Sequence, residues 1–156
     1  MFLLTISKAL EKNHIDYALV GGYAVALHGA VRGTLDVDLV LSLDKKSLNK
    51  AEEIFLKMGL VSRLPVTADE IFEFRKEYIA RRNLVAWSFV DPNQPMNLLD
   101  IIITHDVKDL NVVKFSIQGS PVRVASVSSL IKMKQESGRP QDLEDIKALQ
   151  MIGKKS

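Results

Sequence analysis

Apolar and polar residues follow two different periods along the first part of the chain. Apolar residues recur at helical spacing over residues 2–13, and a short apolar run at 17–20 predicts a strand. A double glycine follows this run, and the alanine-rich segment after it, residues 23–28, favours a short helix. Apolar residues then alternate with polar ones over residues 37–43. This predicts a second strand, because side chains alternate between the two faces of a sheet.

Helical spacing returns in the middle of the chain. Residues 46–58 carry apolar side chains on one face and predict an amphipathic helix. Residues 60–64 favour a short strand. Thr67 followed by Glu70 is a capping-box pattern, so we expect a further helix over residues 67–81.

The second half of the chain predicts two pairs of strands and then two helices. The predicted strands are 84–90, 97–103, 112–117 and 122–125. Turn-forming residues at 91–95 join the first pair into a hairpin, and residues 119–121 predict a second turn or a crossover. Helices are expected over residues 126–137 and 140–152, and proline at the first helical position fits the start of the second.

The order of these elements predicts an α/β (α+β) fold. Helices alternate with strands early and a cluster of strands follows, so we expect a mixed central β-sheet flanked by helices. The chain has 156 residues, of which 47% are hydrophobic and 26% charged, an ordinary balance for a globular protein. We expect residues 1–156 to form a single domain, with a core at about 15–125 and a C-terminal helical pair at about 126–152.

Charge and cysteine content limit the classes of function. The net charge is only +2, which argues against bulk electrostatic capture of nucleic acid. The sequence has no cysteine, so disulfides and thiolate metal sites are excluded, and a reducing compartment is compatible. No apolar run approaches the ~20 residues that a membrane span needs, so we expect a cytoplasmic protein with no membrane partner.

Three aspartates supply the candidate chemistry. Asp36 and Asp38 alternate with apolar residues, so a strand places both carboxylates on one face, roughly 7 Å apart, where like charges repel. Asp100 lies in a very apolar segment, where an ionised carboxylate costs several kcal/mol unless it is paired or binds a metal. Together the three predict a site for Mg²⁺, or alternatively Mn²⁺. The structural alternative is that Asp100 reaches solvent or pairs with an arginine such as Arg32.

A metal site of this kind suits phosphoryl and nucleotidyl transfer. Two ions ~4 Å apart can bind the attacking and leaving oxygens of an in-line displacement, and Asp100 can accept the proton of an attacking hydroxyl. Gly21 and Gly22 allow the backbone to approach a phosphate closely. Other catalytic patterns are absent from the sequence: the three histidines show no zinc spacing, and neither a Walker phosphate loop nor a nucleophile elbow occurs.

The order of these motifs resembles the nucleotidyltransferase superfamily, which includes polymerase beta and the aminoglycoside nucleotidyltransferases. The double glycine is followed after thirteen residues by Asp36-Val37-Asp38-Leu39, and Asp100 lies on a later predicted strand. Residues 32–35, which lead into the acidic pair, and the C-terminal stretch 129–146 are similar to small bacterial nucleotidyltransferases related to abortive-infection toxins. The resemblance covers roughly residues 15–150.

The resemblance implies a role for each motif residue in the first hundred positions. Gly21 and Gly22 would approach the triphosphate through backbone N–H groups. Asp36 and Asp38 would hold the metals, and Asp100 would be the third ligand and the base. Many members of the superfamily have serine where this chain has Gly22, so phosphate binding would rest on backbone donors and on basic residues elsewhere.

Basic residues near the C-terminus and before the acidic pair are the remaining candidates. The resemblance places Lys134 and Arg139 where basic residues contact phosphates, with Asp142 and Asp145 as partners that orient them. The structural alternative is that these cations form a solvated face and that Asp142 only caps the last helix. Arg32 is either a phosphate ligand or a counter-ion of the first acid of the pair, and we favour the second.

Together these features predict a Mg²⁺-dependent nucleotidyltransferase. It would move a nucleoside monophosphate from a nucleoside triphosphate to a hydroxyl, and the resemblance allows a protein side chain, a tRNA end or a small molecule as the acceptor. The alternative is a non-catalytic module that binds a nucleotide or a partner, for example one half of a toxin–antitoxin pair with its cognate antitoxin. A third, structural interpretation pairs the acids with Arg32 and Arg139.

Overall fold

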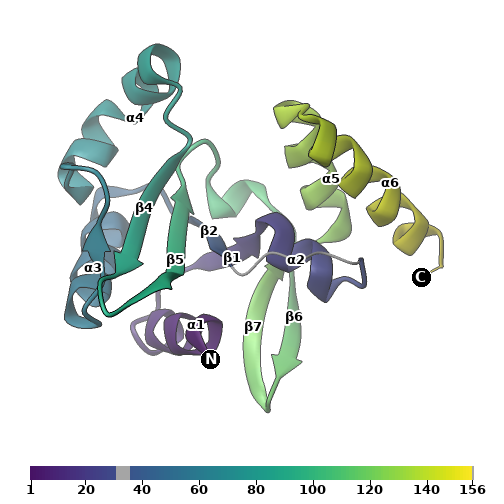
Figure 1. Cartoon of the computed structure of the whole chain (residues 1–156), viewed down its shortest axis with the longest axis horizontal. Helices are drawn as coiled ribbons and strands as arrows, with labels where there is room; N and C mark the ends of the chain where they lie inside the picture. Colours follow the sequence, from purple (N-terminus) through teal and green to yellow (C-terminus); the bar gives the residue numbers. More distant parts are fainter. Residues whose placement is uncertain (31–35, 156) are drawn as a thin grey trace.

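A mixed seven-stranded sheet forms the centre of the molecule (Figure 1). The computed structural model describes residues 1–30 and 36–155. The strands are β1 (Tyr17–Val20), β2 (Val37–Leu41), β3 (Val61–Ser62), β4 (Ala86–Asp91), β5 (Gln94–Ile102), β6 (Val112–Ile117) and β7 (Ser120–Ala125). The helices are α1 (Phe2–Lys12), α2 (Gly21–Leu27), α3 (Lys45–Lys57), α4 (Ala68–Arg82), α5 (Val127–Ser137) and α6 (Pro140–Lys155), with a 3-10 turn at Val107–Asp109. The predicted mixed sheet flanked by helices is confirmed.

The strand order is β3-β4-β5-β2-β1-β7-β6. β2 lies at its centre, antiparallel to β1 and parallel to β5, and β1 in turn is parallel to β7. The predicted hairpin β4–β5 lies on one side of this centre, and β6–β7 lies on the other, where the sequence leaves a turn or a crossover open and the structure has a hairpin. The topology therefore places β2 directly beside β5, although about sixty residues separate them in the sequence.

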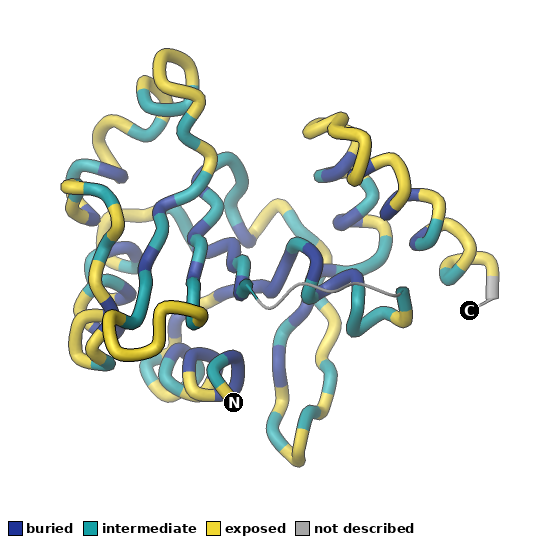
Figure 2. The backbone as a smooth tube through the Cα atoms, in the orientation of Figure 1, coloured by how far each residue is buried: buried dark blue, intermediate teal, exposed yellow. Residues whose placement is uncertain are grey.

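Alternation along the central strands separates a buried apolar face from a polar one. Leu39 is level with Ile101, which is level with Trp87, and all three side chains have no exposed surface. These residues belong to the apolar core, which appears as the dark central segments in Figure 2. The residues that alternate with them in β2 and β5, Asp38 and Asp100, must point to the opposite face.

Local signals in the sequence explain where several helices begin and end. The capping box predicted for α4 is present: Thr67 accepts from the backbone N–H of Glu70, and the Glu70 side chain accepts from the N–H of Thr67. Asp44 caps α3 by accepting from the backbone N–H of Ser47 at 2.8 Å. Gly138 ends α5 with a φ of 66°, a conformation that glycine adopts without strain. Of the described helices, none is long and apolar enough to cross a membrane.

Element boundaries differ from the predicted ones by a few residues. β5 begins at Gln94, so the turn predicted over residues 91–95 is shorter, because Asp91 pairs with Gln94 across it. α2 starts at Gly21 rather than after the double glycine. β2 ends at Leu41, two residues before the predicted end. The start of α2 moves Gly21 and Gly22 from the predicted turn into the first turn of the helix, and the other described candidate site residues stay in their predicted elements.

Candidate active site

Asp38 and Asp100 lie side by side on adjacent parallel strands. They are register partners between β2 and β5, and the negative charge of Asp100 is among the causes that raise the pKa of Asp38. Ser88, level with Asp100 on β4, donates its hydroxyl to Asp100 Oδ1 at 2.5 Å. The sheet therefore brings two of the three predicted acids together and orients one of them.

The environment of Asp38 disfavours its charged form. Burial, and after it the negative charges of Asp100 and Asp36, raise the pKa of Asp38 to about 7. The positive charge of Lys134 acts in the opposite direction. A divalent cation between the two carboxylates would remove the repulsion, and carboxylate oxygens are the donors that Mg²⁺ prefers. The donor chemistry of this pair therefore fits such an ion.

Asp36 lies directly before β2, and its negative charge also acts on Asp38. Its charge is among the causes of the raised pKa of Asp38. Within residues 1–30 and 36–155, no three histidine, cysteine, aspartate or glutamate side chains are arranged as a metal-ligand set. The fold thus assembles the pair Asp38–Asp100, and the role of Asp36 as a third ligand stays a prediction.

Gly21 is required by the position of Asp38. Its φ is +70°, in the left-handed region, and a Cβ at this position would overlap Asp38 Oδ2 and come within 2.9 Å of Asp38 Cγ. Backbone conformation and close approach therefore both demand glycine at the first residue of α2. Gly22 is buried in the next position. The predicted contact of these two glycines with a triphosphate stays a prediction.

A buried lysine from α5 lies against two acids of α6 and lines the same cavity as Asp38. Lys134 Nζ lies 2.8 Å from Asp145 Oδ2 and 3.4 Å from Asp142 Oδ1, both on α6, and its side chain is only 10% exposed. Arg139 Nε donates to Asp142 Oδ2 at 2.9 Å. The acids of α6 thus fix both predicted cations, while the charge of Lys134 also acts on Asp38. The arrangement holds a buried positive charge beside the carboxylate pair.

Charge pairing decides the ionisation of Asp142 and Arg139. Burial alone would raise the pKa of Asp142, but the hydrogen bonds from Arg139 and Ser137 outweigh it and hold this pKa at about 2. The hydrogen bond and the charge of Asp142 raise the pKa of Arg139 in return. Both residues therefore stay ionised at neutral pH.

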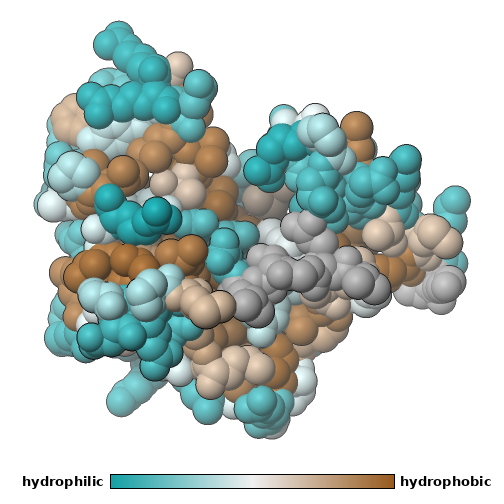
Figure 3. Space-filling view, viewed as in Figure 1, coloured by the Kyte–Doolittle hydropathy of each residue, from teal (hydrophilic) through white to brown (hydrophobic). Residues whose placement is uncertain are grey.

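A cavity of about 770 Å³ connects these features. It lies between the sheet and α5, where Figure 3 shows a notch between the part of the molecule that carries α4 and the part that carries α5. Its lining includes five residues predicted from the sequence or paired with them: Gly21, Asp38, Lys134, Arg139 and Asp142. A volume of this size suits a ligand as large as a nucleotide.

Sequence reasoning missed three polar residues at another part of this cavity. His105 Nε2 lies 2.7 Å from Glu136 Oε2, and His105 Nδ1 lies 2.8 Å from Thr104 Oγ1. All three line the cavity. The sequence shows no zinc spacing around His105, and no pattern in it indicates a partner 31 residues away on a helix.

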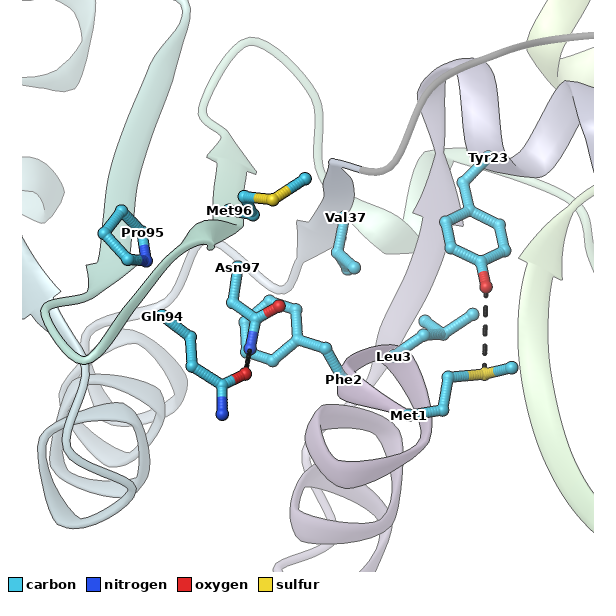
Figure 4. Close-up of a pocket in the computed structure, with 9 residues that line it drawn as sticks. All are labelled: Met1, Phe2, Leu3, Tyr23, Val37, Gln94, Pro95, Met96 and Asn97. Carbon is cyan, nitrogen blue, oxygen red and sulfur yellow. Dashed lines mark hydrogen bonds between the residues drawn. The ribbon is translucent and has the colours of Figure 1, made fainter.

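A second cavity, of about 520 Å³, lies between α1, α2 and the start of β5 and is shown in Figure 4. Two side-chain hydrogen bonds join residues that line it: Tyr23 donates to the sulfur of Met1, and Asn97 donates to Gln94. Its lining contains no acidic or basic side chain. The charged chemistry of the described residues is therefore concentrated in the larger cavity, whereas Arg32, the remaining predicted site residue, lies outside the described residues.

Comparison with known proteins identifies the fold. The sequence matches no family model and no curated protein. Among solved structures, the lincosamide antibiotic adenylyltransferase LnuA, with lincomycin bound, matches with a TM-score of 0.63 and 16% identity over 97% of this chain and 96% of that one. An antigenic nucleotidyltransferase-like protein from Paracoccidioides brasiliensis matches with a TM-score of 0.59 and 19% identity, over 94% and 72%.

A third structure extends the likeness. ANT(2″)-Ia in complex with adenylyl-2″-tobramycin matches with a TM-score of 0.57 and 15% identity, over 92% of this chain and 83% of that one. At these identities the three comparisons establish the fold. The predicted relation to abortive-infection toxins stays a prediction.

Proposed function

We propose that this chain, which has the nucleotidyltransferase-like fold, transfers a nucleoside monophosphate from a nucleoside triphosphate to a hydroxyl acceptor with the help of Mg²⁺ or Mn²⁺. One observation carries the proposal. Asp38 and Asp100 are register partners on adjacent strands, and Asp38 lines a cavity that Lys134 and Arg139 also line. Acids for a cation and cations for phosphates in one cavity are what a bound metal–nucleotide complex requires.

The proposed cation site consists of Asp38 and Asp100, with Asp36 as a further ligand. A bound divalent cation would supply positive charge at the phosphate under attack. Asp100 has a second role in this proposal: it accepts the proton of the attacking hydroxyl. The hydrogen bond from Ser88 fixes the Asp100 carboxyl group for that purpose.

The cations on the opposite side of the cavity bind the phosphates. Lys134 is buried and oriented by Asp142 and Asp145, so its ammonium group is held in place before a ligand arrives. Arg139 is anchored through Nε to Asp142, while its side chain as a whole is 74% exposed and its guanidinium group has further N–H donors for a phosphate. The pyrophosphate leaving group would be stabilised by these two positive charges.

A label-transfer assay tests the proposal. The protein is incubated with Mg²⁺, each of the four α-³²P nucleoside triphosphates and three acceptor sources: cell protein, tRNA, and small hydroxyl compounds that include lincomycin and tobramycin. We expect label to move into one acceptor class and the Asp36→Asn/Asp38→Asn variant to lose the transfer. Mg²⁺-dependent nucleotide binding without any transfer would instead support the non-catalytic module. The absence of both binding and transfer would leave the acids a purely structural role.

A further inference from the structure

The cavity lined by Asp38, Lys134 and Arg139 has a second end, whose walls are largely apolar. Two walls of this end are apolar. Val85 and Ile102 line it from the β4–β5 side, and Leu130 and Met133 line it from α5. Polar groups complete this end, and they include the side chains of Thr104, His105 and Glu136. A slot with apolar walls and hydrogen-bonding groups at its edge suits a flat heteroaromatic ring.

Two hydrogen bonds hold Glu136 at this end. An ionised carboxylate only accepts, so His105 Nε2–H donates to Glu136 Oε2 at 2.7 Å. In the neutral imidazole, His105 Nδ1 is then an acceptor, and the Thr104 hydroxyl donates to it at 2.8 Å. The chain from Thr104 to Glu136 holds the carboxylate of a half-exposed side chain in one orientation. Its second oxygen, Oε1, can accept a hydrogen bond from a ligand in the cavity.

The distance from the charged end fits a single nucleotide. Lys134, the proposed phosphate ligand, and Glu136 are two residues apart on α5, a rise of about 3 Å along the helix axis, and both line the cavity. Side chains at this spacing diverge around the helix, so their polar groups are further apart than the rise, and a ribose can join phosphate and base between them. One molecule can therefore place its phosphates near Lys134 and its base in the apolar slot.

We propose that Glu136, oriented by His105 and Thr104, selects the nucleobase of the triphosphate by accepting a hydrogen bond from an exocyclic amino group. Adenine, guanine and cytosine carry such a group, whereas uracil has no amino group and carries a carbonyl oxygen where cytosine has one, and a carboxylate repels that oxygen. This inference rests on the proposed function, because it assumes that the phosphates occupy the Lys134 end. It adds a base preference and assigns it to one residue.

Matched pairs of nucleotides test this assignment without any turnover. ATP and inosine triphosphate differ by one amino group replaced by a carbonyl, and so do CTP and UTP. Calorimetry with Mg²⁺ and no acceptor should show the amino-bearing member of at least one pair binding about 10-fold or more tightly, as expected for a hydrogen bond to a charged group. Equal affinities within both pairs would overturn the assignment.

The Glu136→Gln variant separates base selection from a structural role. Its amide oxygen can still accept from His105, so the tie between α5 and the loop after β5 persists, but its NH₂ group can donate to a carbonyl. We expect the preference for amino-bearing bases to fall to within about 2-fold. Glu144→Gln, on the exposed surface of α6, is the matched control and should keep the wild-type preference.

Two further outcomes contradict the inference, and they differ from failure of the proposed function. Discrimination that survives in Glu136→Gln would show that other groups select the base. A variant that changes the KM for the acceptor but not nucleotide discrimination would assign this end of the cavity to the acceptor. If no nucleoside triphosphate of any base binds to the wild-type protein, the proposed function itself fails.

Discussion

Two acidic pairs in this molecule are placed in opposite electrostatic surroundings. Asp38 and Asp100 meet on the sheet, where burial and neighbouring acids raise the pKa of Asp38 to about 7. Asp142 and Asp145 lie on α6 against Lys134, and there the pKa of Asp142 is held at about 2, because hydrogen bonds outweigh its burial. Too little positive charge surrounds the first pair to balance its negative charge. The second pair is balanced by Lys134 and Arg139 of the same chain.

This difference separates a stabilising group from a binding group. The acids of the α6 pair already form ion pairs with Lys134, so they strengthen the packing of α6 on α5 and hold Lys134 in place. The sheet pair costs stability as long as both groups are ionised, and a cation would turn that cost into binding affinity. Substitutions in the two pairs should therefore have opposite effects on stability, and only the sheet pair should be indispensable for a metal-dependent reaction.

The largest expected effect is on catalysis. Asp38→Asn and Asp100→Asn should each lower kcat/KM for nucleotidyl transfer by about 10³-fold, because several kcal/mol of charge stabilisation at the phosphate depend on the cation site. Initial rates with labelled nucleoside triphosphate measure this. Asp109→Asn, an exposed acid of the 3-10 turn, is the control and should keep wild-type rates. A transfer rate within a few-fold of wild type in the Asp38 variant would remove the proposed role of the pair.

Gly21→Ala should give the largest loss of stability. The new Cβ combines left-handed backbone strain with overlap on Asp38, for a total cost of about 2–5 kcal/mol. Gly138→Ala is the matched comparison, because its φ is +66° and the nearest atom to a Cβ is 3.9 Å away, so about 1–2 kcal/mol is expected. Urea denaturation measures both variants. Equal losses would mean that the close approach of Asp38 to the turn carries no energy.

Asp38→Asn should stabilise the metal-free protein. A carboxyl group whose pKa is raised by folding favours the folded state at low pH, and this contribution is lost as pH rises from about 4 through 7. The variant should therefore gain on the order of 3 kcal/mol over wild type at pH 8 and little at pH 4. Unfolding free energies in EDTA across this range measure it. A variant less stable than wild type at pH 8 contradicts the account of the sheet pair.

Asp142→Asn should lower the free energy of unfolding, and by less than Asp38→Asn raises it. A carboxyl group whose pKa is lowered by folding stabilises the protein above its unfolded pKa, and this stability disappears as pH falls through about 2. The variant should be about 2 kcal/mol less stable than wild type at pH 7, and the two unfolding curves should converge between pH 4 and pH 2. A difference that stays constant down to pH 2 would indicate lost packing and not lost charge pairing.

Local patterns were sufficient to predict most of the elements and the face of the strand on which Asp38 lies. Alternation in β2 placed Asp38 on the polar face, and Thr67 with Glu70 located the start of α4. These features depend on residues that are neighbours in sequence. Their information is therefore present in a single chain without any structure.

Features that depend on tertiary contacts could not be predicted from the sequence. Nothing near His105 indicates that α5 will bring Glu136 within hydrogen-bond distance, because that contact depends on how α5 docks against the sheet. The need for glycine at position 21 was predicted from phosphate approach, whereas the structure adds a second reason in Asp38. The balance of charge around Asp38 also depends on Lys134, which is 96 residues away.

The central claim is that the Asp38–Asp100 pair is a divalent-cation site, and a thermal unfolding series with Mg²⁺ tests it most directly. A ligand that binds only the folded state stabilises it by about 2.7 kcal/mol at a concentration 100 times its Kd. We expect Mg²⁺ to raise the Tm of the wild-type protein and to leave the Asp38→Asn/Asp100→Asn variant unchanged. An unchanged wild-type Tm, or an equal rise in both proteins, would contradict the claim.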